Sequence, residues 1–252
     1  KDAKPVRDWI SSDRLQISLK QTVGDRWAIM AGGTGSGFLD AIFSRGLATS
    51  MEVTNALAAR LLKALKDDDF TAERFEYVAR VHEINRTNND RTASASYTAW
   101  RDFDLWNAWF RVWALGVGLG DLKLASTYRR YKKTHDDSIL PDAEEPLGLF
   151  YSQHKGFGEL YNAAVAKMDE VEAGTTDPKE ASRYIFNLVR NAKFNSAANH
   201  LGDPERHFIN AGAPWTTVRT LAWLATSAPP EIRTLSMGLL GDMGRKPHPA
   251  HG

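Results

Sequence analysis

Residues 26–47 read Arg26-Trp-Ala-Ile-Met-Ala-Gly-Gly-Thr-Gly-Ser-Gly-Phe-Leu-Asp-Ala-Ile-Phe-Ser-Arg-Gly-Leu47. The apolar run at 27–31 is typical of a buried strand, residues 32–37 are rich in glycine, and a long helical pattern follows. At such a junction the backbone amides can point outward, and the N-terminus of the helix adds a partial positive charge. The stretch therefore predicts an anion or phosphate site, with a flexible turn or linker as the alternative.

Two common nucleotide motifs do not fit this turn. A P-loop needs a lysine after its last glycine, but Gly37 is followed by Phe38. The dinucleotide fingerprint that starts at Gly33 and Gly35 needs a third glycine where Phe38 stands. The turn therefore belongs to neither class.

The residues after the glycines carry a more specific pattern, Gly37-Phe38-Leu39-Asp40 followed by Phe43-Ser44-Arg45-Gly46-Leu47 and a long helix. This pattern resembles the C-terminal flavin loop of FAD-dependent halogenases and related flavoprotein monooxygenases, and the similarity extends over roughly residues 8–120. The resemblance implies FAD as the cofactor, and a C4a-hydroperoxyflavin that halogenates or hydroxylates an electron-rich, aromatic small molecule. It also implies a separate flavin reductase as a partner.

The resemblance assigns roles to individual residues. The loop along the ribityl chain and pyrophosphate of FAD would comprise Gly33, Thr34, Gly35, Ser36, Gly37, Phe38 and Asp40. The turn beside the flavin ring would comprise Ser44, Arg45 and Gly46, whose amides would also hold a halide ion. No general acid or base is identified, so the catalytic residues stay unknown.

Three departures from the family pattern affect this loop. Gly33 or Thr34 stands where an acidic residue often contacts the ribityl hydroxyls, the glycine run is about two residues longer, and Ala41 replaces a frequent proline. The family's Rossmann fingerprint does not occur in the chain, so we expect the chain to correspond to the C-terminal portion of such an enzyme. The alternative function is a non-catalytic helical interaction or scaffold module that no longer binds FAD.

The predicted fold class is α+β and mainly α. Leu15, Ile17 and Leu19 alternate with polar residues, which predicts a strand. With the run at 27–31 and the turn at 23–26, it would form a hairpin or two neighbouring strands. This short strand pair would be the remnant of a FAD/NAD(P)-binding sheet. We predict a flavin-binding part over residues 1–66 and a helical substrate domain over residues 67–252.

Helical spacing predicts several apolar faces in the rest of the chain. One face comprises Leu47, Met51, Thr54, Ala58, Leu61 and Leu65, and a second comprises Phe75, Val78, Ala79, His82 and Asn85. The polar stretch 86–96 reads as a frayed or solvent-facing continuation. Asp104 is expected to cap an aromatic helix that loosens at the glycines of 116–120, before a separate basic helix. Asp177-Pro178 predicts another helix start.

The aromatic helix offers a candidate substrate pocket. Trp106, Trp109 and Trp113 follow helical spacing, and the resemblance suggests that they line a pocket for an aromatic substrate. Core packing is the alternative, because aromatic stripes commonly serve only to bury area. The seven histidines form no convincing metal-ligand pattern, so no metal site is predicted.

Composition limits the classes of partner. Lys and Arg total 32 against 31 Asp and Glu, a net charge of +1, which argues against a general nucleic-acid binder. The chain has no cysteine, which excludes disulfides and a catalytic thiol. No apolar run approaches the roughly 18 residues of a membrane span. We therefore expect a cytoplasmic protein without a membrane span.

Overall fold

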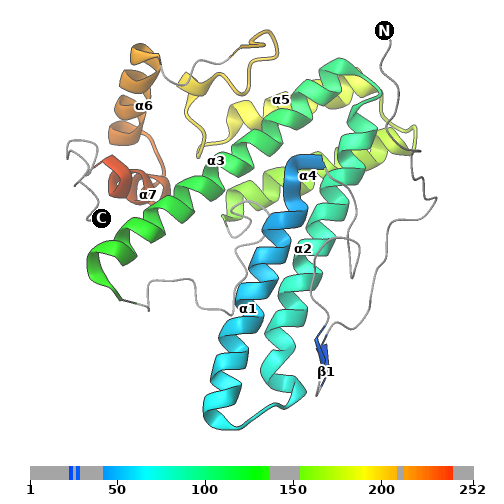
Figure 1. Ribbon diagram of the computed structural model, residues 1–252. Helices are drawn as coiled ribbons and strands as arrows, with labels where there is room; N and C mark the ends of the chain where they lie inside the picture. Colours follow the sequence, from blue (N-terminus) through cyan, green and yellow to red (C-terminus); the bar gives the residue numbers. More distant parts are fainter. Residues whose placement is uncertain (1–22, 25–26, 29–41, 137–153, 209–212, 241–252) are drawn as a thin grey trace, which may run out of the picture. The chain divides into compact units, whose positions relative to one another are not determined.

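The computed structural model describes residues 23–24, 27–28, 42–136, 154–208 and 213–240. This part of the chain is mainly helical, which confirms the helical half of the predicted fold class (Figure 1). Contacts divide the chain into two compact units, residues 1–90 and 91–252, and helix α2 continues from one into the other. The boundary predicted at residue 66 separates a flavin-binding part from a substrate domain, whereas these units are defined by contacts alone. The predicted boundary therefore stays a prediction.

The predicted strand pair lies mostly outside the described residues. Within them, β1 (Val23–Gly24) pairs antiparallel with β2 (Trp27–Ala28), in the register Val23 with Ala28 and Gly24 with Trp27. The predicted strand at 15–19 and the end of the run at 27–31 fall outside that part. A flavin-type sheet therefore stays a prediction.

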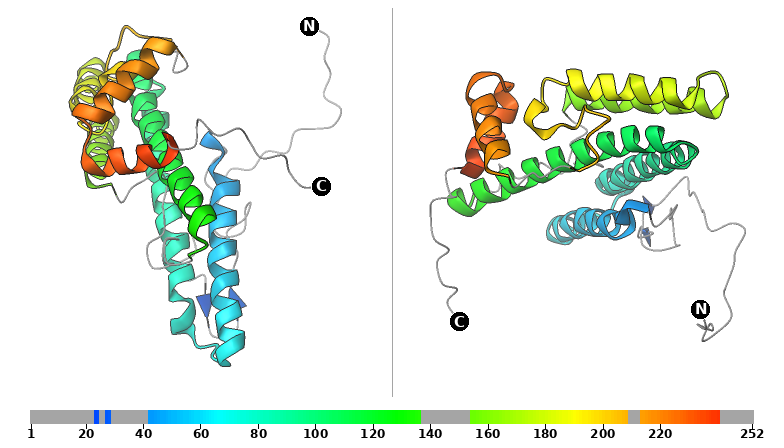
Figure 2. Two further views of the ribbon diagram at one scale, coloured as in Figure 1. Left: turned by 90° about the vertical axis from the view of Figure 1, so that its left-hand side faces the viewer. Right: turned by 90° about the horizontal axis from the view of Figure 1, so that it is seen from above.

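The first unit contains a helical hairpin formed by α1 (Arg45–Asp67) and α2 (Ala72–Ala99), which lie side by side in Figures 1 and 2. Its core comprises Val53, Ala56 and Ala64 from α1 with Phe75, Val78 and Val81 from α2. At the connection, the guanidinium of Arg74 pairs with Asp67 at 2.7 Å and with Asp69 at 2.9 Å. The second predicted apolar face is confirmed as the one that α2 turns toward α1, since His82 and Asn85 are also buried.

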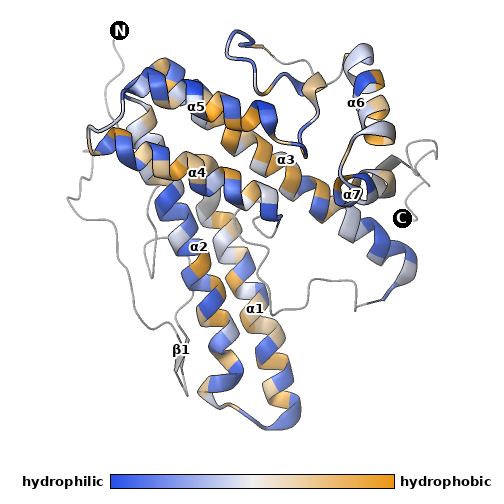
Figure 3. Ribbon diagram, turned by 180° about the vertical axis from the view of Figure 1, so that it is seen from behind, coloured by the Kyte–Doolittle hydropathy of each residue, from blue (hydrophilic) through white to orange (hydrophobic). Residues whose placement is uncertain are grey.

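The apolar face predicted for α1 is not the face that packs on α2. Leu47, Met51, Leu61 and Leu65 are exposed, and so are Thr54 and Ala58. The contact with α2 is made instead by the smaller side chains of Val53, Ala56 and Ala64. Apolar residues therefore occur on α1 both in the contact with α2 and at exposed positions. Figure 3 shows apolar residues along the length of α1 on the side that it presents.

The second unit is organised around the 32-residue helix α3 (Phe103–Thr134). Its N-cap is Asp102, whose carboxylate accepts from the amides of Asp104 at 2.9 Å and Leu105 at 3.1 Å, so the predicted cap at Asp104 is wrong by two residues. The predicted break at 116–120 does not occur. Leu115 and Leu119 are buried in the core, and this packing offsets the roughly 1 kcal/mol that each helical glycine costs.

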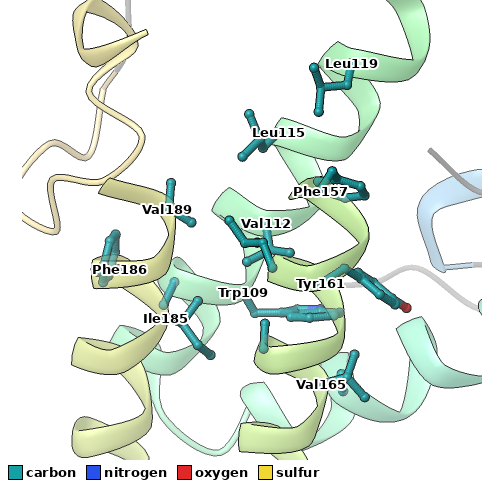
Figure 4. Close-up of a cluster of buried hydrophobic side chains, with 14 of the residues drawn as sticks. Trp109, Val112, Leu115, Leu119, Phe157, Tyr161, Val165, Ile185, Phe186 and Val189 are labelled. Atoms are coloured by element: carbon teal, nitrogen blue, oxygen red, sulfur yellow. The ribbon is translucent and has the colours of Figure 1, made fainter. Parts of the chain in front are cut away.

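Helices α4 (Lys155–Glu172) and α5 (Pro178–Asn191) lie along α3 (Figure 2). The predicted start of α5 is confirmed, since the Asp177 carboxylate accepts from the amides of Lys179 and Glu180. Figure 4 shows side chains of α3, α4 and α5 meeting in one core, with Trp109, Phe157 and Ile185 among them. The short helix η3 (Ala197–Asn199) and helices α6 (Pro214–Thr226) and α7 (Pro230–Leu240) complete the unit.

Candidate functional site

The described part of the predicted flavin site is the turn that leads into α1. Gly33, Thr34, Gly35, Ser36, Gly37, Phe38 and Asp40 lie outside the described residues. The turn itself is described from η1 (Ile42–Ser44), in which Phe43 has φ 60° and ψ 14°, a left-handed conformation that is uncommon for a bulky residue. Helix α1 then begins at Arg45. The backbone is therefore kinked at Phe43, directly before the predicted ring-side turn at Ser44, Arg45 and Gly46.

The start of α1 favours an anion. The first amides of a helix have no intrahelical acceptor and form the positive end of its dipole. The first turn of α1 contains no acidic residue that would occupy those amides. Gly46 in this turn is half-buried, and its carbonyl accepts a bond from the Ser50 hydroxyl at 2.9 Å. The amides at the start of α1, and not this carbonyl, are donors of the kind that an anion accepts from.

Two polar contacts fix this end of α1 against α2. The Asn89 side-chain amide donates to the Thr49 hydroxyl at 3.1 Å. One turn further along, the fully buried Asn85 donates to the Glu52 carboxylate at 2.9 Å. The hairpin interface is thus polar near the start of α1 and apolar toward the connection. Helical spacing in the sequence placed Asn85 on the packing face but did not indicate its partner Glu52, because periodicity identifies a face and not a cross-helix pair.

His82 lies one turn before Asn85 on α2 and is buried. Burial lowers the pKa of this histidine below its ordinary value of 6.5; Glu83 opposes this effect and Arg86 adds to it. The side chain is therefore neutral at physiological pH. A charge on His82 would destabilise the hairpin core.

Trp109, a predicted pocket residue, lies in the core of the second unit. Its side chain is 0% exposed, and its indole Nε1–H donates to the Ser96 hydroxyl at 2.8 Å. Its ring packs on Tyr161, whose hydroxyl lies 2.8 Å from that of Thr92. Burial raises the pKa of Tyr161. The segment 86–96 is accordingly helical, and its residues Thr92 and Ser96 are buried, so the solvent-facing continuation predicted for it is wrong there.

Trp106 and Trp113, the other predicted pocket residues, lie in a row of rings outside this core. The row, here called the aromatic row, comprises Tyr97, Trp100, Trp106, Phe110 and Trp113. Neighbouring rings are 4.9 to 6.0 Å apart between centroids, as in favourable aromatic pairs. The three predicted tryptophans therefore do not share one environment.

Arg111 is a buried cation that the sequence analysis missed. Its guanidinium donates to the Asn107 side chain at 3.2 Å and to the carbonyl of Arg206, while Asn107 donates to the carbonyl of Pro204 at 3.4 Å. Burial lowers the pKa of Arg111, against the opposing charge of Asp203. These two side chains of α3 anchor the loop after η3, and the ring of His207 in this loop lies 6.3 Å from the ring of Phe103 at the start of α3.

Two kinds of site are absent from the described residues. No group of three or more histidine, aspartate or glutamate side chains is arranged to hold a metal ion there. Among the helices in the described ranges, none combines the length and apolarity that crossing a membrane requires.

Sequence comparison identifies related proteins. No family model matches the chain. It is 36% identical over 241 residues to monodechloroaminopyrrolnitrin halogenase PrnC of Pseudomonas fluorescens, a match that covers 92% of the chain and 42% of that protein. It is 34% identical over 236 residues to tetracycline 7-halogenase of Kitasatospora aureofaciens, covering 93% of the chain and 42% of that protein. The chain thus spans about two fifths of the length of these relatives.

Solved structures agree with this relationship. The crystal structure of halogenase PltM aligns with a TM-score of 0.75 and 29% identity, over 83% of this chain and 42% of that one. PltM in complex with phloroglucinol and FAD aligns with a TM-score of 0.74 and 27% identity, again over 83% of this chain and 42% of the other.

Proposed function

The chain is related to the FAD-dependent halogenases over more than nine tenths of its length, and on this basis we propose that it forms the halide-binding turn and helical body of such an enzyme. The observation that carries the proposal is local. Phe43 has a left-handed backbone conformation, and the 23-residue helix α1 begins two residues later with no acidic residue in its first turn. The halogenase pattern has its anion-binding turn at this position.

The residues present fit FAD and a halide. The loop comprising Gly33, Thr34, Gly35, Ser36, Gly37, Phe38 and Asp40 would hold the ribityl and pyrophosphate groups. The amides of Ser44, Arg45 and Gly46 would hold the halide beside the flavin ring, where the positive end of the α1 dipole stabilises an anion. Reduced FAD, supplied by a separate reductase, would give two of the four electrons that reduce oxygen to water, and the halide would give the other two as it is oxidised.

The substrate that fits best is an electron-rich aromatic small molecule. PltM was solved with phloroglucinol, an aromatic compound. In this chain, Trp106 and Trp113 belong to the aromatic row and offer ring faces or edges to such a substrate. Trp109 would not contact the substrate, because its ring packs on Tyr161 and its N–H donates to Ser96 in the core.

A second candidate function is a helical scaffold module that does not bind FAD. Two observations favour it. The match covers only 42% of each relative. A dinucleotide normally rests on a parallel sheet, and the described residues contain no such sheet.

A hybrid protein separates the two functions. In it, this chain replaces the matched 42% of the PrnC halogenase. If the chain has kept its enzymatic role, the purified hybrid retains FAD, visible in its absorbance spectrum, and with a flavin reductase and bromide it brominates phloroglucinol. The hybrid carrying Asp40→Ala should retain less FAD. A folded hybrid that stays colourless after incubation with FAD contradicts the proposal and supports the scaffold.

A further inference from the structure

Two asparagines of α2 hold the first two turns of α1. The side-chain amide of Asn89 donates to the Thr49 hydroxyl at 3.1 Å, and that of Asn85 donates to the Glu52 carboxylate at 2.9 Å. The two asparagines are four residues apart and therefore lie on the same face of α2. Two contacts one turn apart fix the register of α1 along α2 as well as its rotation.

Buried apolar packing on α1 begins only after these contacts. Among the described residues, the core of the hairpin starts on α1 at Val53, whereas Leu47 and Met51 before it are exposed. The ends of helices fray where tertiary contacts do not hold them. Directional polar contacts therefore hold the start of α1 where the described core does not reach.

Thr49 lies one helical turn after the ring-side turn. In an α-helix the amide of residue 49 donates to the carbonyl of residue 45, and the amide of residue 50 donates to the carbonyl of residue 46. The Ser50 hydroxyl adds a second bond to the Gly46 carbonyl, at 2.9 Å. A displacement of Thr49 is therefore passed on to the ring-side turn through the backbone of α1.

We propose that Asn89 is a positioning residue for the halide. Through Thr49 it fixes the direction in which the amides of the ring-side turn point. The inference rests on the proposed function, which places a halide at those amides. Groups that bind a reacting species have to be held to within about 0.5 Å and 10–20°. A hydrogen bond depends on angle as well as on distance, so Asn89 restrains the rotation of α1 about its axis.

Steady-state bromination of phloroglucinol by the hybrid with PrnC separates positioning from folding. Asn89→Leu removes the donor at similar size, and Thr49→Val removes the acceptor. In each variant the bromide KM should rise at least about 5-fold, while kcat at saturating bromide and the FAD dissociation constant stay within about 2-fold of the parent hybrid. The double variant should show the same rise as either single variant, because both remove one contact.

Two further variants are controls for this comparison. Thr49→Ser keeps the hydroxyl and should retain the bromide KM of the parent hybrid. Thr54 is exposed, and its hydroxyl donates to the Ser50 carbonyl of its own helix at 2.7 Å. Thr54→Val therefore removes a threonine hydroxyl from α1 without touching α2, and should leave the bromide KM unchanged.

Amide hydrogen exchange in the chain itself tests the restraint without any cofactor. In Asn89→Leu, the amides of Thr49 and Ser50 should exchange about 10-fold faster, whereas those of residues 53–64 should not change. Faster exchange in a chain whose hybrid binds no FAD would contradict the proposed function, and with it the halide role, while the restraint on α1 stands.

Four results would overturn the inference. They are an unchanged bromide KM in both single variants, single effects that add in the double variant, unchanged exchange at Thr49 and Ser50, and a loss of FAD that accounts for the whole loss of activity. The last of these would make Asn89 a residue that only supports folding.

Discussion

The indole Nε1–H of Trp109 donates a hydrogen bond to the hydroxyl oxygen of Ser96 at 2.8 Å. Ser96 in turn donates to the carbonyl of Thr92 at 2.7 Å, so one buried hydroxyl joins α3 to the last part of α2. Because both groups are buried, neither has water as an alternative partner. Trp109 is thereby a structural residue of the second unit, which supports any site that the aromatic row forms.

Trp109→Phe tests this role. The substitution removes the donor and leaves a small cavity, so we expect the free energy of unfolding to fall by about 2–4 kcal/mol. Trp113→Phe, at a half-buried position of the same helix, is the control and should cost less than about 1 kcal/mol. Urea denaturation followed by circular dichroism measures both, and equal losses would argue against a core position for Trp109.

Asn85→Ala tests the polar contact that fixes the start of α1. It leaves the Glu52 carboxylate without a donor that now lies 2.9 Å away, and should lower the free energy of unfolding by about 1–3 kcal/mol. Glu76→Ala, at an exposed position on α2, should change it by less than about 0.5 kcal/mol. A double-mutant cycle with Glu52→Ala isolates the pair, and a coupling energy of zero would show that the contact adds nothing.

His82 makes the stability of the hairpin depend on pH. Because burial lowers its pKa below 6.5, the unfolded chain binds a proton at this residue in a pH range in which the folded chain does not. Its contribution to stability is therefore complete above about pH 6.5 and is lost as the pH falls below that value. Denaturant titrations at about pH 7.5 and pH 5.5 should show a smaller loss for His82→Gln than for the parent. His207→Gln, at an exposed site, should behave as the parent.

Arg111→Met should release the loop that this side chain anchors. The substitution keeps most of the apolar stem and removes the donors to Arg206 and Asn107. Amide hydrogen exchange in residues 201–208 should become about 10-fold faster, while exchange in α5 stays unchanged. Arg183→Met, at an exposed position, is the control. Unchanged exchange in the loop would mean that Arg111 does not hold it.

Local signals in the sequence predicted several elements well. The Asp177-Pro178 start of α5 depends only on neighbouring residues, and the structure confirms it. The packing face of α2 was also predicted, because a regular helix keeps its 3.6-residue period. The Phe-Leu-Asp and Phe-Ser-x-Gly pattern at 38–46 led to the halogenase relationship, which the comparisons confirm.

Features that depend on distant partners were not predictable in this way. The six residues of the first α1 face are regular, yet the hairpin uses the smaller Val53, Ala56 and Ala64 instead. Periodicity also does not separate Trp109 in the core from Trp113 in the aromatic row, since both lie on α3 within four residues. The glycines at 116–120 suggested a break that the burial of Leu115 and Leu119 prevents.

FAD binding by the hybrid with PrnC tests the central claim, that residues 33–46 form part of a flavin site. The measurement is a fluorescence titration of FAD with the parent hybrid, with its Asp40→Ala variant, and with its Asp121→Ala variant as an exposed control on α3. We predict saturable binding by the parent and by Asp121→Ala, and a dissociation constant at least about 10-fold higher for Asp40→Ala, because the variant has no carboxylate to accept a hydrogen bond from the cofactor. Equal dissociation constants for all three proteins, or no binding by the parent, would contradict the account.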